Sequence, residues 1–239
     1  MSLYPDSFEI QNKDGNFPAV LCVEHARSYI PAHLNNLGVS ENDVQTHIGW
    51  DIGIEGVSRY LSDDLNIRAI YGLYSRLVID INRSLEHAEL IRPESDGIKI
   101  PGNAGLGAAE REARIEQIFN PYHEAAKKLI RKDDVVIGMH SCTPQLRGGD
   151  FRPWHIGLST YDSEDEMMAL AEVLKESNLK VGIHEPYDCR AMPGTSLDTH
   201  GRQRGLPHIL VEIRQDLIAD EAGQKRWGNI MAKALIGLE

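Results

Sequence analysis

Two short apolar runs of this chain each end in a histidine: residues 20–25 (VLCVEH) and 135–140 (VVIGMH). Both runs are rich in β-branched residues and are bounded by polar loops, which is typical of buried strands. In open α/β sheets, ligands bind in the crevice at the carboxyl ends of the strands. His25 and His140 are therefore expected at one edge of a sheet, where two imidazoles could begin a zinc site.

Strand-like and helical patterns alternate along the chain. The strand-like runs lie near 18–24, 67–72, 76–81, 134–139, 154–159, 180–184 and 208–213. The helical patterns lie near 40–61, 108–131, 163–177 and 219–238. This alternation predicts a three-layer α/β fold, in which helices flank a central, mostly parallel or mixed sheet on both faces. Ser40 and Asp43 form a possible capping pair at the start of the first helix, and Pro121 is expected to bend or divide the second.

Length and charge narrow the class of protein. A chain of 239 residues without repeats or linkers is expected to form a single domain, residues 1–239. Its net charge of −11 argues against nucleic-acid binding, and an anionic substrate would need a local arginine pocket. We expect neither a membrane span nor a secretory signal, and three cysteines at no metal-like spacing favour the reducing cytoplasm.

A catalytic zinc site needs a third protein ligand besides the two histidines. His47 and Asp51 are four residues apart and would share one face of a helix. Glu24 is adjacent to His25, and neighbours on a strand point to opposite faces. We favour Asp51 as the third ligand and keep His47 and Glu24 as alternatives. The competing interpretation is that His25 and His140 are hydrogen-bonded histidines at strand ends.

Glu212 is a carboxylate inside the apolar run 209–213. A buried charge is costly unless it is paired or functional, and a glutamate beside a metal site can act as general base and then protonate a leaving amine. We interpret Glu212 as the catalytic residue. The alternative is a buried ion pair with Arg214, which is two residues away and could lie beside it.

The residues expected to bind substrate are Arg76, Asn82, Arg83, His155 and Tyr187. Arg76, Asn82 and Arg83 flank the apolar run 77–81, and the planar fork of arginine matches a carboxylate. The assignments of His155 and Tyr187 rest on their positions near loops.

The segments 84–107 and 185–207 are long loops and are expected to form walls or lids of the site. Cys142, two residues after His140, offers a nucleophilic-cysteine alternative. We disfavour it because residues this close in sequence rarely have the geometry of a thiolate–imidazolium pair.

Taken together, segments in one order along residues 18–218 resemble the N-formylglutamate amidohydrolase family. They are 22–26 (CVEHA), 47–51 (HIGWD), 75–83 (SRLVIDINR), 100–103 (IPGN), 140–144 (HSCTP), 152–157 (RPWHIG), 185–187 (EPY), and 205–208 (GLPH) through 212–214 (EIR). The resemblance implies a zinc-peptidase-like (phosphorylase/hydrolase-like) fold similar to that of the carboxypeptidases.

In enzymes of that fold, two histidines and a carboxylate hold zinc, an Asn-Arg pair binds the substrate carboxylate, and a late glutamate is the base. The resemblance implies these roles for His25 and His140, for Asn82 and Arg83, and for Glu212. The carboxypeptidase His-x-x-Glu pattern is absent, because Ser28 stands at the glutamate position, and Asp51 is the substitute ligand. His184 replaces the more usual asparagine before Glu185.

The implied activity is hydrolysis of the amide bond of an N-formyl or other N-acyl amino acid, such as N-formylglutamate, with one Zn²⁺ per chain or another divalent metal in its place. The partner is then a small acidic N-acyl amino acid rather than nucleic acid or membrane. Two alternatives remain: a carboxypeptidase-like hydrolase of small peptides, and a non-catalytic binding protein that has kept the pocket.

Overall fold

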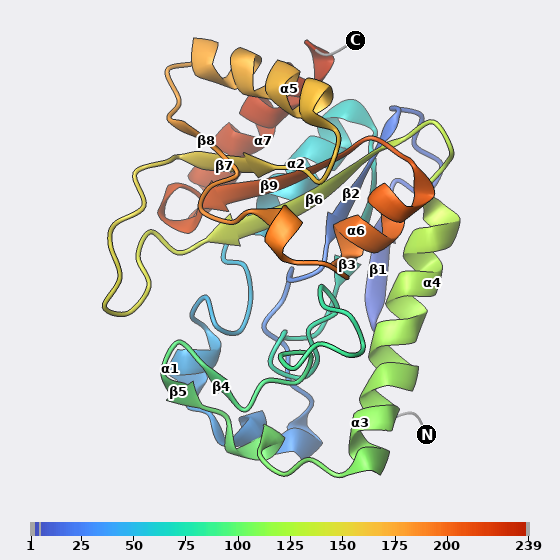
Figure 1. Ribbon diagram of the computed structural model, residues 1–239, viewed down its shortest axis with the longest axis vertical. Helices are drawn as coiled ribbons and strands as arrows, with labels where there is room; N and C mark the ends of the chain where they lie inside the picture. The colour runs from blue at the N-terminus through green and yellow to red at the C-terminus, as the bar shows by residue number, and fades with distance from the viewer. Residues whose placement is uncertain (1–2, 5, 238–239) are drawn as a thin grey trace.

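A seven-stranded mixed sheet in the order β1-β3-β2-β6-β9-β7-β8 is the centre of the computed structural model, which describes residues 3–4 and 6–237 (Figure 1). Strands β3, β2, β6 and β9 are parallel, whereas β1 and β7 pair antiparallel with β3 and β9. The strands are β1 (Phe8–Gln11), β2 (Ala19–Val23), β3 (Arg68–Gly72), β6 (Val135–Cys142), β7 (Ile156–Ser159), β8 (Val181–Ile183) and β9 (His208–Arg214), and a separate hairpin joins β4 (Glu94–Ser95) and β5 (Ile98–Lys99). This sheet confirms the predicted α/β class.

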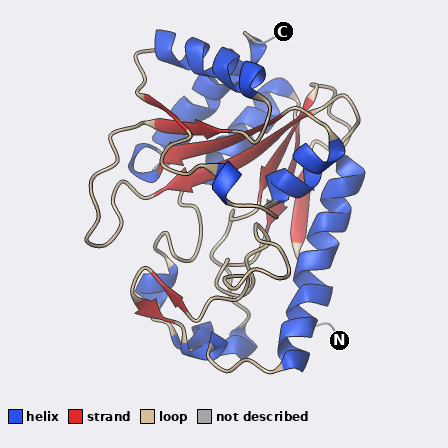
Figure 2. Ribbon diagram, viewed as in Figure 1, coloured by secondary structure: helices blue, strands red, loops and turns tan. Residues whose placement is uncertain are grey.

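Helices lie on both faces of the sheet, as Figure 2 shows by the helices on either side of the strands. They are α1 (Glu41–Val44), α2 (Ile54–Leu65), α3 (Ala108–Arg114), α4 (Asn120–Leu129), α5 (Glu164–Glu176), α6 (Ser196–His200) and α7 (Glu221–Ile236). Helices α2, α5 and α7 pack on one face, and α4 and α6 on the other. None of the helices in the described part of the chain has both the length and the apolar character that crossing a membrane requires.

The alternation of side chains along the strands decides which face carries the candidate site. In β2, Leu21 and Val23 belong to the cluster under α2, α5 and α7, whereas Val20 and Cys22 belong to the cluster under α4. By the same alternation, His140 in β6 and Glu212 in β9 emerge on the α4 and α6 face. The two strands pair in parallel with His140 directly beside Glu212.

The helix predicted from Ser40 to Leu61 is wrong as one element. Ser40 does cap α1, since its side chain accepts a hydrogen bond from the Asp43 amide, but α1 ends at Val44 and α2 begins only at Ile54. Gly53 ends the intervening turn with φ of 80°, and a Cβ there would meet the Ile218 carbonyl oxygen at 2.0 Å. His47 and Asp51 therefore lie in a turn and share no helix face.

The helical pattern predicted over 108–131 is present and is divided, as Pro121 led us to expect. A π-helical segment, Ile115–Phe119, lies between α3 and α4. Proline lacks the amide hydrogen that would donate to the carbonyl one turn earlier, so a regular α-helical ladder cannot run through this point.

The strand predicted at 76–81 is wrong. This segment is buried but irregular, and its backbone bonds to loop carbonyls and side chains rather than to a neighbouring strand; the Asp80 amide, for example, donates to the Leu90 carbonyl at 2.8 Å. The Asn103 amide donates to the Leu77 carbonyl at 2.8 Å, and Arg114 Nη1 donates to the Val78 carbonyl at 2.7 Å. This apolar run therefore forms a buried loop rather than a strand, because polar groups distant in sequence make the hydrogen bonds that a neighbouring strand would otherwise make. Strand β1 and the β4–β5 hairpin, on the other hand, were not predicted.

Candidate metal centre

A cavity of about 340 Å³ lies at the carboxyl ends of β6 and β9, and several elements far apart in sequence line it. Both long loops contribute to its wall, as predicted: Arg92, Ser95 and Asp96 come from 84–107, and Tyr187 and Met192 come from 185–207. The cavity is therefore located where open α/β sheets bind ligands.

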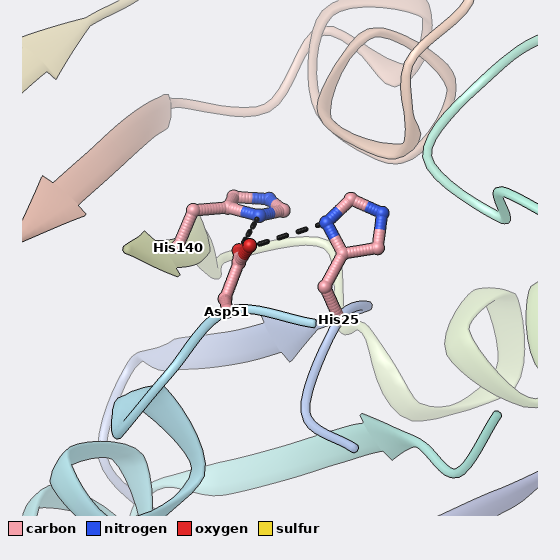
Figure 3. Close-up of side chains that lie close together, drawn as sticks. All are labelled: His25, Asp51 and His140. Carbon is pink, nitrogen blue, oxygen red and sulfur yellow. Dashed lines mark hydrogen bonds and ion pairs between the residues drawn. The ribbon is translucent and has the colours of Figure 1, made fainter. Parts of the chain in front are cut away.

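His25, Asp51 and His140 converge in this cavity, and one ligand atom from each lies within 4.8 Å of the other two (Figure 3). Asp51 Oδ2 lies 2.8 Å from Nδ1 of His140 and 3.6 Å from Nδ1 of His25. His25 follows β2, His140 belongs to β6, and the turn before α2 supplies Asp51, whose amide donates to the His25 carbonyl at 2.9 Å. The structure thus brings together the three residues that the sequence analysis favoured as ligands.

The far nitrogen of each imidazole faces a second carboxylate. His25 Nε2 lies 2.6 Å from Asp80 Oδ1, and His140 Nε2 lies 3.3 Å from Glu24 Oε2. A carboxylate on the distal nitrogen fixes the tautomer and orientation of a metal-binding histidine and raises its basicity. Both rings can therefore present an unprotonated Nδ1 to a shared cation.

The donor set fits a divalent metal. Nδ1 of His25 is buried and has no hydrogen-bond partner among the described residues. Although burial opposes ionisation of Asp51, the Arg76 guanidinium, the hydrogen bond with His140 and the nearby His25 ring hold its pKa well below its ordinary value. Burial lowers the pKa of His140, yet its hydrogen bonds to Asp51 and Glu24 raise it to about 10. The carboxylates thus favour positive charge at this point, and two imidazoles with one carboxylate are typical zinc donors.

Glu212 lies beside this group. It is 8% exposed, and its Oε2 has no hydrogen-bond partner in the described part of the chain. Burial raises the pKa of Glu212 to about 7. The alternative of a Glu212–Arg214 pair is not present, because Arg214 instead binds Asp216, with Nε donating to Oδ1 at 2.7 Å.

The arginines of the predicted substrate site do not all have the same surroundings. Arg76 hydrogen-bonds to Asp51, so its charge is directed at a candidate ligand. Arg83 lines the cavity, and its recorded hydrogen bond runs from Nη1 to the Asn82 carbonyl at 3.2 Å. The side-chain oxygen of Asn82 is occupied, because Oδ1 accepts from the Ser196 backbone amide at 2.9 Å, and Nδ2 of Asn82 lies 3.4 Å from His140 Nε2. Arg83 is thus the cavity arginine best placed to meet a substrate anion.

Arg92 is a residue of the site that sequence reasoning missed. It lines the cavity, and its Nη2 donates to Asp80 Oδ2 at 3.1 Å. Asp80, the partner of His25, lies two residues before Asn82 in a segment that the sequence analysis had already singled out. Arg92 lies in a long irregular loop, and nothing in the sequence indicated its role, because no local pattern there predicts the direction of a side chain.

Other predicted residues lie elsewhere or have other partners. His155 lies outside the residues that line the cavity, and its Nδ1 accepts from the Lys180 amide at 3.0 Å. His47 lies 3.2 Å from Asp96 and outside the three-residue ligand group. Tyr187 lines the cavity, and its hydroxyl accepts from Arg152 at 3.1 Å.

Cys142 also lines the cavity. Burial raises the pKa of its thiol to about 12. Because the thiolate rather than the thiol is the nucleophile, this environment disfavours the cysteine-nucleophile alternative.

Comparisons with known proteins agree with this geometry. The model of the N-formylglutamate amidohydrolase family matches residues 17–219. A gene product from Agrobacterium tumefaciens has a similar crystal structure, with a TM-score of 0.91, 29% identity, and coverage of 98% of this chain and 94% of that one. N-formylglutamate amidohydrolase from Ralstonia eutropha JMP134 shares the fold, with a TM-score of 0.68, 17% identity and 96% coverage of each chain. A search of curated proteins finds no significant match. Because the family model spans most of the chain, the protein belongs to the N-formylglutamate amidohydrolase family.

Proposed function

We propose that this protein is a zinc-dependent hydrolase that cleaves the amide bond of an N-formyl or other N-acyl amino acid carrying a carboxylate, such as N-formylglutamate. The observation that supports the proposal best is the arrangement in one cavity: His25, Asp51 and His140 converge, Glu212 lies beside His140, and Arg83 lines the same space. The family match supports amide hydrolysis.

In the proposed reaction, His25, Asp51 and His140 hold the metal. A zinc ion bound there would polarise the acyl carbonyl and make water more acidic. Glu212 takes a proton from the attacking water and then delivers it to the departing amine. No lysine or arginine donates a hydrogen bond to Glu212 within the described ranges, so its carboxylate is available for both transfers.

Arg83 binds the substrate carboxylate and so converts binding into placement of the acyl group. Tyr187 forms part of the opposite loop wall. Arg76 steadies Asp51 in this proposal, which changes its role from the substrate binding expected at first. We also propose a reducing compartment, the cytoplasm, because Cys22, Cys142 and Cys189 are free buried thiols.

The test measures zinc content and N-formylglutamate turnover on the same samples of wild-type protein, His25→Ala, His140→Ala and Glu212→Gln. We expect about one zinc per wild-type chain. Both histidine variants should lose metal and activity together. Glu212→Gln should keep the metal and lose about 10²- to 10⁴-fold in kcat, the usual contribution of a general base.

The outcomes separate the alternatives. Zinc without N-formylglutamate turnover would direct the assay to other N-acyl amino acids and to short peptides, the carboxypeptidase-like alternative. Ligand binding that is unchanged in Glu212→Gln, with no turnover in any sample, would favour the binding protein. Wild-type protein that is free of metal and active in the presence of a chelator would refute the metal-dependent mechanism.

A further inference from the structure

The carboxylates that face the two candidate histidine ligands differ in their own hydrogen-bond partners. Asp80, which faces His25, also accepts hydrogen bonds from the Arg92 side chain at 3.1 Å and from the backbone amide of Asn82 at 3.0 Å. Glu24, which faces His140, has no ion pair with an arginine or lysine in the described part of the chain. Its carboxylate is nevertheless 1% exposed. A buried carboxylate without such a partner is costly, so the structure must compensate for it in another way.

Two buried hydroxyl groups share with both Glu24 carboxylate oxygens the lack of a hydrogen-bond partner among the described residues. Tyr122 comes from α4 and is 0% exposed, and Ser196 comes from the start of α6 and is 1% exposed. Burial and the interaction with Glu24 raise the pKa of the Tyr122 phenol well above its ordinary value, which keeps the phenol protonated as a donor. Although burial opposes it, His140 and Ser196 lower the pKa of Glu24, and the Glu24 charge contributes to the raised pKa of Tyr122, which places both hydroxyls near the carboxylate that faces His140.

The position of Glu24 also argues against a role as the third metal ligand. Its Oε2 faces Nε2 of His140, whereas Asp51 faces Nδ1 of the same ring. Glu24 is accordingly outside the three-residue ligand group. The alternative that Glu24 is itself the third ligand therefore loses to Asp51, and its buried charge requires a different explanation.

We propose that Glu24 is the positioning residue of His140, and that Tyr122 and Ser196 hold Glu24 in place. Glu24 accepts the hydrogen of Nε2, so Nδ1 stays unprotonated and faces Asp51 and His25. Ser196 connects this support to the substrate side, because its amide donates to Asn82 Oδ1. The inference shares with the proposed function only the assumption that the site binds a metal.

The experiment measures zinc affinity, without substrate, by competition with a chromophoric chelator. The variants are Glu24→Gln, which keeps the shape and removes the charge, and Tyr122→Phe, which removes only the supporting hydroxyl. The control is Tyr71→Phe, because Tyr71 is also 0% exposed and its hydroxyl donates to Gln11 at 2.8 Å on the sheet edge. The visible absorption of the cobalt-loaded proteins reports ligand geometry in the same samples.

Glu24→Gln should weaken zinc binding about 10- to 100-fold, the usual effect of losing such an outer partner. Tyr122→Phe should weaken it less and should shift the cobalt spectrum in the same direction, whereas Tyr71→Phe should change neither. The proposal is overturned if Glu24→Gln binds zinc as tightly as wild type. It is equally overturned if Tyr122→Phe and Tyr71→Phe behave alike, a comparison that remains valid even if Glu24→Gln does not fold.

This result is separable from the proposed function. Wild-type protein that binds zinc but hydrolyses no N-acyl substrate would refute the proposed activity and leave the Glu24 comparison intact. Zinc-dependent turnover together with unchanged affinity in Glu24→Gln would refute only the role of Glu24.

Discussion

The two faces of the central sheet differ in kind. Under α2, α5 and α7, the sheet packs against regular helices through apolar side chains such as Leu21, Ile137 and Trp227. The opposite face carries α4 and α6 together with irregular segments (Figure 1). The cavity and its buried charges lie on this face. The first face is stabilised by removal of apolar area from water, whereas the second depends on hydrogen bonds between specific polar groups.

The difference matters for function because the charged groups of the candidate site are buried on the second face. Glu24, Asp51 and Asp80 are at most 3% exposed, yet each faces a histidine. Loss of any partner leaves such a buried group unpaired and lowers the free energy of unfolding. This face is therefore less stably packed than the apolar face, but its polar groups are held in fixed positions around the site. Changes to the two faces should therefore separate stability from chemistry.

The largest expected effect on stability comes from the apolar face. Trp227 in α7 is 1% exposed, and Trp227→Ala should lower the free energy of unfolding by about 3–5 kcal/mol, because it leaves a cavity in the core. Zinc bound per folded chain should not change. Denaturant unfolding and zinc titration measure the two quantities, and Ile236→Ala, at a 52% exposed position in the same helix, is the control. Equal losses of stability and of zinc affinity would show that the faces are coupled.

A smaller effect is expected from the polar support of the other face. Asn103 donates to the Leu77 and Arg92 carbonyls and accepts from Arg114 at 2.9 Å. Asn103→Ala leaves these buried groups unpaired and should cost about 1–3 kcal/mol of unfolding free energy. It should also raise KM for a carboxylate substrate, because the loosened segment carries Arg83. An unchanged KM with reduced stability would argue that the segment only supports the fold.

The smallest effect is a pH dependence confined to the site face. His123 and His200 lie 2.9 Å apart between Nδ1 and Nε2, and His123 Nε2 donates to the Ile81 carbonyl at 2.9 Å, so both rings are held neutral. Burial lowers the pKa of His123, and burial together with the nearby His123 lowers that of His200 from 6.5 to about 3. A histidine whose pKa is lowered by folding opposes folding only below its unfolded pKa, because the unfolded chain then binds the proton more readily, so stability should fall as the pH drops below 6.5.

His200 should contribute a slope of up to about 1.4 kcal/mol per pH unit in that range, and His123 should add to it in the same direction. Urea unfolding of wild type and His200→Gln between about pH 5 and 8 tests this, because linkage predicts a shallower decline in the variant. Parallel profiles for the two proteins would contradict the assignment.

The sequence predicted the parts of this molecule that obey local rules. The runs ending at His25 and His140 were recognised as strands because they are short, β-branched and fully apolar, and Glu212 stood out as a charge inside such a run. The segment 76–81 has a similar apolar character but is a loop, since its backbone bonds to distant groups such as the Asn103 and Arg114 side chains and the Leu90 carbonyl. No local sequence pattern could reveal that these distant groups take the place of a neighbouring strand.

The candidate third ligand, Asp51, shows the same limit. Asp51 was favoured for its spacing from His47 on a helix, yet the chain forms a turn there, and Asp51 meets His25 and His140 because its amide donates to the His25 carbonyl. The residue was the one that the structure brings to the site, but the helix behind the prediction was wrong.

The sequence by itself determined the α/β class, the strands that deliver His25, His140 and Glu212, and the family to which the chain belongs. Only the tertiary structure decided which residues support them: Glu24 behind His140, Arg92 behind Asp80, and Arg76 on Asp51. The physical reason is that strand and helix patterns arise from neighbours along the chain. The partner of a buried charge is instead chosen by whichever distant side chain the folded backbone brings within hydrogen-bonding distance.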